Sequence, residues 1–252
     1  VLVSNQLGKI AGEVNVKLTN ISEQSTYYGD LDVNSFDLGK LFDQDIVQKL
    51  SFKGKIKGSG LKIDDASLEL DGLVSEIGYN NYNYKNITVD GKLGQSIFDG
   101  YVDIKDPNLV AEVEGKVDFN KELNTFKIKG LLDNANLKPL GFTADDYRVQ
   151  STINFDFIGN KLDDWIGRAR FLDTKIQKDN KEFAVDSMYF NSGIFENQRR
   201  FSMVTEFFNF YVNGNFVPST LINDVNTLVK EYLLYFNENE TVRKNYYLTK
   251  NL

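Results

Sequence analysis

The stretch that decides the fold is residues 61–119, LKIDDASLELDGLVSEIGYNNYNYKNITVDGKLGQSIFDGYVDIKDPNLVAEVEGKVDF. Apolar and polar residues alternate in it in about five short runs, which is the pattern of half-buried β-strands. Turn-forming residues separate the runs, among them Asp71-Gly72, Asn80-Asn81, Asp99-Gly100 and Asp106-Pro107-Asn108. No catalytic motif occurs in the stretch. The question for the rest of the chain is therefore what the apolar side of such a sheet contacts.

The alternation continues on both sides of this stretch. Further strands are predicted in residues 1–34, 126–132, 151–159, 181–192 and 199–217. Two segments have apolar residues at helical spacing instead, 36–50 and 219–236. We expect a short helix in each, the first with a break near Asp43, and the second with Ser219 as N-cap because its hydroxyl can accept a first-turn amide.

Sequence features recur at intervals of about 100 residues, which is the mark of a repeat architecture. Gly12-Glu-Val14 resembles Gly115-Lys-Val117, and the pair Asp64-Asp65 resembles Asp163-Asp164. The intervals predict one elongated body of degenerate repeats, with a partial unit at 1–58 and further units at 59–158 and 159–252.

Composition excludes several classes of function. The net charge of −7 lacks the basic footprint that nucleic-acid binding needs. Without Cys or His there is no disulfide, no thiolate nucleophile and no Ser-His-Asp triad. No apolar run is long enough for a transmembrane helix and no signal peptide is visible, and we expect the chain to be a piece of something longer.

Two acidic groupings have features of functional sites, one of a calcium loop and the other of paired carboxylates. Asp30, Asp32, Asn34 and Asp37 suggest a calcium loop, but Ser35 and Leu41 stand where such a loop needs Gly and Glu. The pairs Asp64-Asp65 and Asp163-Asp164 have no basic or aromatic partner pattern and are interpreted as repeat turns. We therefore expect no enzyme, no metal site and no cofactor.

The aromatic content leaves two interpretations open. The chain has 19 Phe and 13 Tyr, many of them in predicted strands. These side chains could be ordinary core and cross-strand pairs. They could equally form an apolar face that is too long to be covered by the protein's own side chains.

Several motifs together resemble the TamB family (translocation and assembly module) in its Bacteroidetes-type form, within the AsmA-like group. The resemblance covers about residues 28–235, where FDLGKLF, NANLKPL and GNFVPSTLINDVNTLVKEYL are family-like. Its signature is a Tyr-rich run followed by a DPN turn and a Gly-containing strand, here carried by Tyr82, Tyr84, Asn86, Ile87, Gly91, Phe98, Gly100, Ile104, Asp106, Pro107, Asn108, Gly115, Asp118 and Phe119.

The resemblance implies an all-β fold with a few short helices, shaped as a curved or U-shaped sheet called a β-taco. It implies a periplasmic location, with inner-membrane anchoring by an N-terminal segment absent from this chain. It further implies a bridge whose apolar groove carries phospholipid between the inner and outer membranes. The implied partners are phospholipid acyl chains and an Omp85-type outer-membrane barrel, which regions outside this chain would contact.

Alternation alone assigns the residues of the groove. Thirteen apolar residues are predicted to face inward: Leu68, Leu70, Ile87, Val89, Val102, Ile104, Val113, Val117, Ile128, Phe155, Phe157, Met203 and Phe210. A one-residue slip in any strand would turn its residues outward. The two predicted helices could plug or line the groove ends. Two alternatives stay open: a scaffold that assists outer-membrane β-barrel assembly by β-augmentation, and a structural spacer.

Overall fold

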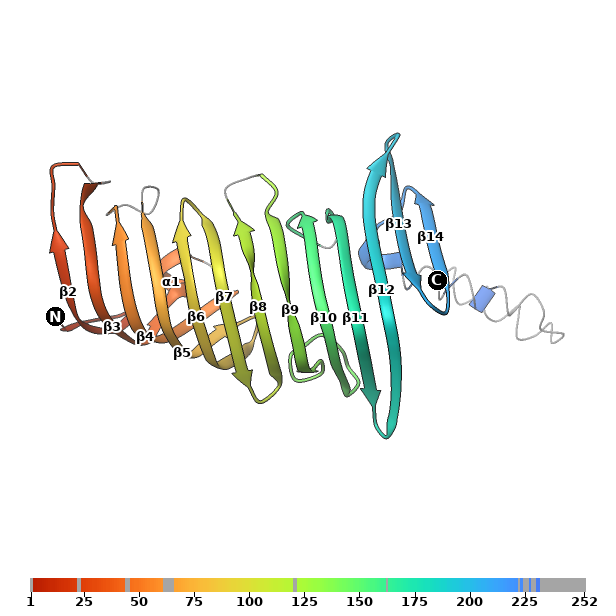
Figure 1. The fold of residues 1–252 in the computed structure, drawn as a ribbon, viewed down its shortest axis with the longest axis horizontal. Coiled ribbons are helices and arrows are strands. Elements are labelled where there is room, and N and C mark those ends of the chain that lie inside the picture. The colour runs from red at the N-terminus through yellow and green to blue at the C-terminus, as the bar shows by residue number, and fades with distance from the viewer. Residues whose placement is uncertain are drawn as a thin grey trace, which may run out of the picture.

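The chain forms one open antiparallel sheet in which every strand pairs with its neighbours in sequence (Figure 1). The structure, a computed structural model, describes residues 2–21, 24–43, 46–60, 66–119, 122–161 and 163–221, together with Asn223, Thr227, Lys230 and Glu231. The all-β class with few short helices is therefore confirmed. The repeat turn predicted at Asp64-Asp65 and most of the helix predicted at 219–236 lie outside the described residues.

The sheet has 14 strands in the order β1 to β14, and consecutive strands lie side by side. Their bounds are β1 Leu2–Asn5, β2 Gly8–Lys17, β3 Thr26–Asp37, β4 Val47–Ser59, β5 Ser67–Tyr79, β6 Tyr82–Gly94, β7 Ile97–Asp106, β8 Leu109–Asp118, β9 Thr125–Asn136, β10 Tyr147–Ile158, β11 Ile166–Lys178, β12 Lys181–Phe195, β13 Gln198–Thr205 and β14 Asn209–Gly214.

The stretch at 61–119 contains four long strands, β5 to β8, where the sequence predicts about five short runs. Asp71-Gly72 and Asp99-Gly100, predicted as turns, lie inside β5 and β7. Gly72 pairs with Gly54 of β4, and Gly100 pairs with Gly91 of β6. Gly72 and Gly100 are therefore sites of close packing within the sheet. Asn80-Asn81 does form a hairpin turn, in which both residues have positive φ.

The helix predicted for 36–50 is mostly wrong. Helix α1 covers only Leu38–Phe42, where the Asp37 side chain accepts a hydrogen bond from the Lys40 amide at the start. Asp43 ends the helix in the left-handed conformation, its amide bonded to the Gly39 carbonyl. Val47–Leu50 then belong to β4, because Leu50 pairs with Phe36 in the sheet.

Ser219 is not the N-cap that the sequence predicts. The helical residues begin at Pro218, whose fixed φ suits the first helical position. The Ser219 amide and hydroxyl both donate to the carboxylate of Asp163, at 2.8 and 3.0 Å. A side chain from the β10–β11 loop therefore holds the start of this helix.

Side chains divide the sheet into two faces. Residues opposite each other in register share a face, and one such row crosses β5 to β9 as Gly72, Val89, Val102, Val113 and Gly130. The adjacent row consists of Asp71, Asp90, Tyr101, Glu114 and Lys129. We call the side that carries the first row the apolar face and the side that carries the second the polar face.

Most irregularities in pairing fall at one level across the sheet, and one further register shift lies between Val47 and Leu50 of β4. The register shifts beside Val33, Phe52, Ala111 and Ser151, and Asp173 has positive φ inside β11. Bulges of this kind bend strands and increase their twist. Apolar-face residues next to this line are buried: Val33, Phe52, Val74, Ile87, Ala111, Ser151, Thr174 and Val185. The line of irregularities therefore runs along a buried band of the apolar face.

Strand positions recur along the chain. Strands β3 to β8 begin at Thr26, Val47, Ser67, Tyr82, Ile97 and Leu109, and β9 to β14 begin about 100 residues later, at Thr125, Tyr147, Ile166, Lys181, Gln198 and Asn209. The predicted unit limits at residues 58 and 158 fall at the ends of β4 and β10, which are equivalent strands. The division into units stays a prediction.

A buried polar network ties together the turns after β5, β7 and β9. Asp106, 2% exposed, accepts hydrogen bonds from the Tyr82 hydroxyl at 2.6 Å, the Lys85 amide at 3.0 Å and the Asn108 amide at 2.8 Å. The Asn108 side chain donates to the Tyr82 hydroxyl and accepts from Asn136. Asp106 to Asn108, assigned to turn chemistry from the sequence, therefore also joins β6 to β9.

Replacing Asp106 with Ala should destabilise the protein by about 3 kcal/mol, because three donors lose a buried acceptor. The free energy of unfolding from urea titrations measures the change. Asp99→Ala, at an exposed position of the same strand, should change it by less than about 0.5 kcal/mol. Equal effects of the two substitutions would show that the network contributes no particular stability.

Candidate functional site

The thirteen residues predicted to face inward all lie on the apolar face. Val89, Val102 and Val113 are consecutive register partners, as are Ile128 and Phe155. Strand alternation from these rows places the remaining members on the same side, up to Met203 and its partner Phe210. The structure thus brings the set together on one surface, while its role in holding lipid stays a prediction.

The apolar face is only partly covered by the protein itself. Of the thirteen residues, Ile87 and Phe157 are buried and the others are half-buried. No second sheet exists among the described residues to pack against this face. A compact two-layer protein would bury such a face almost completely, so the described sheet leaves a long apolar surface accessible.

The two halves of the apolar face differ in chemistry. From β2 to β7 it is mainly aliphatic, with a core of Val33, Phe52, Val74 and Ile87. From β9 to β14 it carries a continuous line of aromatic rings, whose successive centroids are 5.3 to 6.5 Å apart: Phe126, Trp165, Phe157, Phe155, Phe171, Phe190, Phe201 and Phe210. Offset and edge-on pairs of this kind stabilise one another.

In the aliphatic half of the apolar face, phenylalanine rings lie over glycines. A Cβ atom on Gly54 or Gly72 would stand 2.7 and 2.8 Å from the ring of Phe52. A Cβ on Gly91 would stand 2.9 Å from the ring of Phe98, which also lies over Gly100. Glycines in the strands therefore make room for these rings on the apolar face.

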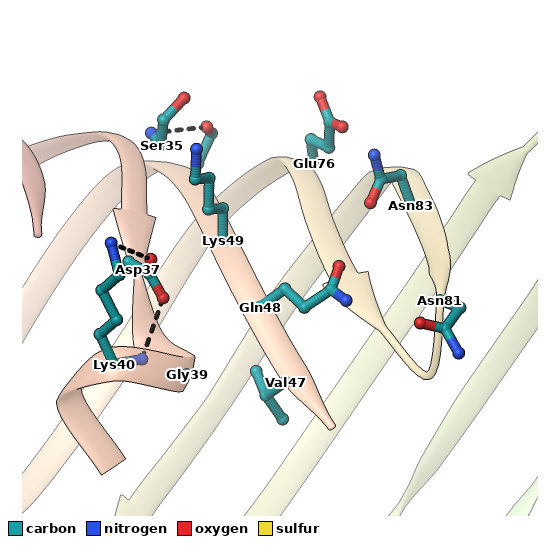
Figure 2. A pocket seen from close by; sticks show the side chains of 11 residues that line it. Ser35, Asp37, Gly39, Lys40, Val47, Gln48, Lys49, Glu76, Asn81 and Asn83 are labelled. Atoms are coloured by element: carbon teal, nitrogen blue, oxygen red, sulfur yellow. Dashed lines mark hydrogen bonds and ion pairs between the residues drawn. The ribbon is translucent and has the colours of Figure 1, made fainter. Parts of the chain in front are cut away.

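A polar cavity of about 520 Å³ lies beside α1 (Figure 2). Its lining includes Lys40, Gln48, Lys49, Glu76 and Asn83. The Lys40 amide, more than any other group, lowers the pKa of Asp37 at its rim. The cavity shows no nucleophile paired with a base, and the described residues contain no group of three or more acidic side chains that could hold a metal ion.

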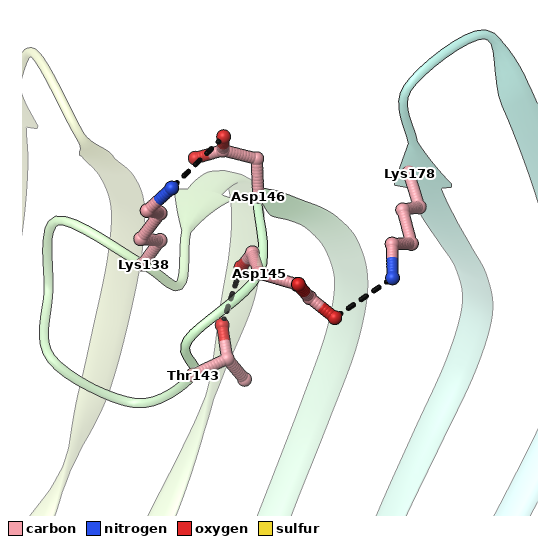
Figure 3. A network of polar contacts seen from close by, with 5 residues as sticks. All are labelled: Lys138, Thr143, Asp145, Asp146 and Lys178. Carbon is pink, nitrogen blue, oxygen red and sulfur yellow. Dashed lines mark hydrogen bonds and ion pairs between the residues drawn. The ribbon is translucent and has the colours of Figure 1, made fainter.

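The loop between β9 and β10 is fixed by ion pairs (Figure 3). Lys138 pairs with Asp146 at 3.3 Å, and Lys178 of β11 pairs with Asp145 at 2.8 Å. The hydrogen bond from Lys178 is the largest influence on Asp145 and lowers the pKa of its carboxyl. Lys178 also lies 4.9 Å from the ring of Tyr147, so this corner of the sheet is both charged and aromatic.

Sequence reasoning missed several residues of the apolar face. Phe126, Phe171 and Phe190 belong to the aromatic line, and Trp165 joins it from the β10–β11 loop. Alternation in RARFLD and SMYFNS was a usable signal for Phe171 and Phe190. Trp165 has no periodic signal, since it precedes its strand.

Comparison with known proteins leaves the family open: no family model, curated protein or solved structure matches this chain. Among the described helical residues, no helix combines the length and apolarity needed to cross a membrane. The resemblance to the TamB family therefore stays a prediction.

Replacing Gly91 with Ala should cost about 1–2 kcal/mol of stability, because the new methyl group displaces the Phe98 ring. In a Phe98→Ala background the same change should cost markedly less, since the displaced ring is gone. A double-mutant cycle from urea unfolding measures the coupling. A coupling energy near zero would show that the ring does not depend on the glycine.

Proposed function

We propose that the apolar face holds phospholipid acyl chains, and that the protein is a non-enzymatic segment of a bridge along which phospholipid moves between two membranes. One observation carries the proposal: an apolar surface runs across the sheet from β2 to β14 and stays half exposed, without a second layer among the described residues. Apolar surfaces of this extent normally mark an interaction site.

The size of the face suits lipid. Fourteen strands about 4.8 Å apart span roughly 60 Å. The hydrocarbon core of a bilayer is about 30 Å thick, and a single acyl chain crosses half of it. The face is therefore several acyl chains long, which suits transit along a path better than retention in one pocket.

The shape also favours this function. Bending toward the apolar face would turn a flat sheet into a trough, the U-shaped form expected from the resemblance. Each CH₂ group that an acyl chain buries there contributes about 0.8 kcal/mol without any directed polar contact. A lipid path therefore needs no sequence motif beyond alternation, which agrees with the absence of catalytic motifs in the sequence.

Repetition supports a bridge rather than a closed binding protein. Six strands in each half of the sheet begin at equivalent positions about 100 residues apart. Stacked units of this kind extend a surface without altering its cross-section. On the resemblance, we propose that the bridge lies in the periplasm between the inner and outer membranes and that its far end meets an Omp85-type barrel.

Photocrosslinking tests the path on two adjacent strands. Val89 and Val102 are register partners on the apolar face, and Thr88 and Asp103 are register partners on the polar face one residue away. A photoreactive residue at Val89 or Val102 should form phospholipid adducts in cells, detected by mass spectrometry of the purified protein. The same residue at Thr88 or Asp103 should form few.

The controls separate the alternatives. Equal adducts on both faces would indicate nonspecific contact, and adducts confined to Thr88 and Asp103 would overturn the assignment of the face. Absence of lipid adducts at all four positions would overturn the lipid path and favour the structural spacer. Adducts to unfolded outer-membrane protein rather than to lipid would favour the assembly scaffold.

A further inference from the structure

The last strand of the sheet has an open edge. Strand β14 pairs with β13 on one side, and among the described residues no strand pairs with its other side (Figure 1). The described chain after β14 turns away from this edge, because Ser219 bonds to Asp163 in the β10–β11 loop. The outer edge of Asn209–Gly214 is therefore open in the part of the chain that the structure describes.

Strand β14 lacks the features that protect a sheet edge from pairing. Natural edge strands carry charged side chains, a proline or a bulge, which discourage the addition of another strand. The sequence of β14, NFYVNG, has no charged residue and no proline, and its pairing with β13 has no register shift. An edge of this composition favours the addition of a further strand.

The repeat identifies the kind of strand that this edge fits. Val14 of β2, Val113 of β8 and Val212 of β14 are each 99 residues from the next. The hairpin turns before β8 and β14 also match, because the side chains of Asp106 and Thr205 each accept from the amide two residues further on. Strands β2, β8 and β14 are therefore equivalent. The first two are followed by the equivalent strands β3 and β9.

Both of these following strands have a glycine opposite the valine. Gly29 of β3 pairs with Val14, and Gly130 of β9 pairs with Val113. A Cβ atom on Gly29 would stand 2.8 Å from the Cα atom of Val14, and one on Gly130 would stand 2.9 Å from that of Val113. Backbones this close leave no room for a side chain. The strand that fits beside β14 therefore needs a glycine opposite Val212.

The end of the following strand also bonds to the preceding turn. The Asp37 amide at the end of β3 donates to the Leu7 carbonyl in the β1–β2 turn at 2.7 Å. The Asn136 amide at the end of β9 donates to the Asn108 carbonyl in the β7–β8 turn at 2.8 Å. The equivalent residue of the β13–β14 turn is Phe207, which is 61% exposed. A third strand of the same type would cover that turn.

We infer that the outer edge of β14 binds the first strand of another unit of the same repeat, an antiparallel strand with a glycine opposite Val212. Because cross-strand partners share a face, the apolar residues of the added strand would join the rows of the apolar face. The interface would extend the proposed lipid path, although the evidence for it is the repeat and does not depend on lipid.

Hydrogen exchange with an added peptide tests the inference. The probe is the protein's own β9 segment, residues 124–137, added to the full chain. Exchange of the outward amides of Asn209–Gly214, measured by mass spectrometry, should slow at least about tenfold, because the added strand bonds to them. The same peptide carrying Gly130→Val should bind at least about tenfold more weakly, because the new side chain meets the backbone of β14.

A matched pair of protein variants separates edge pairing from side-chain contact. The Phe208 carbonyl faces Thr205 of β13, so alternation along the strand points the Tyr211 amide outward. Y211P removes that amide at an edge, where proline is tolerated, whereas Y211T removes only the ring. Y211P should lose at least about tenfold in peptide affinity, and Y211T should stay within about twofold of the unaltered protein. Circular dichroism confirms that both variants keep the sheet.

Other occupants of the edge give different results. Equal binding of the Gly130→Val peptide would show that any strand docks there, as an assembly scaffold requires, and would overturn the inference. Self-association of the protein alone that Y211P abolishes, without protection by the peptide, would assign the edge to a second copy of this chain instead. Unchanged exchange in β14 at saturating peptide would contradict the inference as well.

The lipid experiment gives an independent result. Protection of β14 by the peptide, without lipid adducts at Val89 or Val102, would keep the interface and overturn the lipid path. Adducts at those positions without protection of β14 would keep the path and overturn the interface.

Discussion

The whole structure depends on the alternation of side chains in strands that pair only with their sequence neighbours. Because successive residues point to opposite sides of a strand, pairing that keeps apolar residues opposite each other across a single sheet gathers them on one side. Val89, Val102 and Val113 lie in one row for this reason, and Asp90, Tyr101 and Glu114 lie in the row beside it. Since the described residues form no second layer, this sheet has one apolar surface left to cover.

The line of bulges along that surface is the second constraint. A bulge changes which residues of a strand face inward, so a set of bulges at different levels would mix the two faces. Here most of them fall at one level, and buried residues from Val33 to Val185 follow the line. The Asp106 network lies just beyond it and joins β6 to β9 with buried hydrogen bonds, which are directional and therefore fix the register there.

The division of the apolar face into an aliphatic and an aromatic half bears on how a lipid would move. Over β4 to β7, glycines leave room for the rings of Phe52 and Phe98 beside aliphatic side chains. Over β9 to β14, rings pack against each other edge to face. Weak, repeated apolar contacts permit movement along a surface more readily than one deep pocket does.

The sequence by itself determined the strand class and, for the strands that hold the thirteen inward residues, which side chains share a face, because alternation is a local signal. It placed all thirteen inward residues on one side, from Leu68 to Phe210. It misjudged Asp71-Gly72 and Asp99-Gly100, since a glycine that ends a strand and one that receives a neighbour's ring look the same in sequence. The tertiary structure alone decided that residues 47–50 are a strand, because Leu50 pairs with the distant Phe36. It alone decided that Asp163 holds the helix at Ser219 and that the bulges align, because such contacts join residues far apart in the chain and leave no periodic trace.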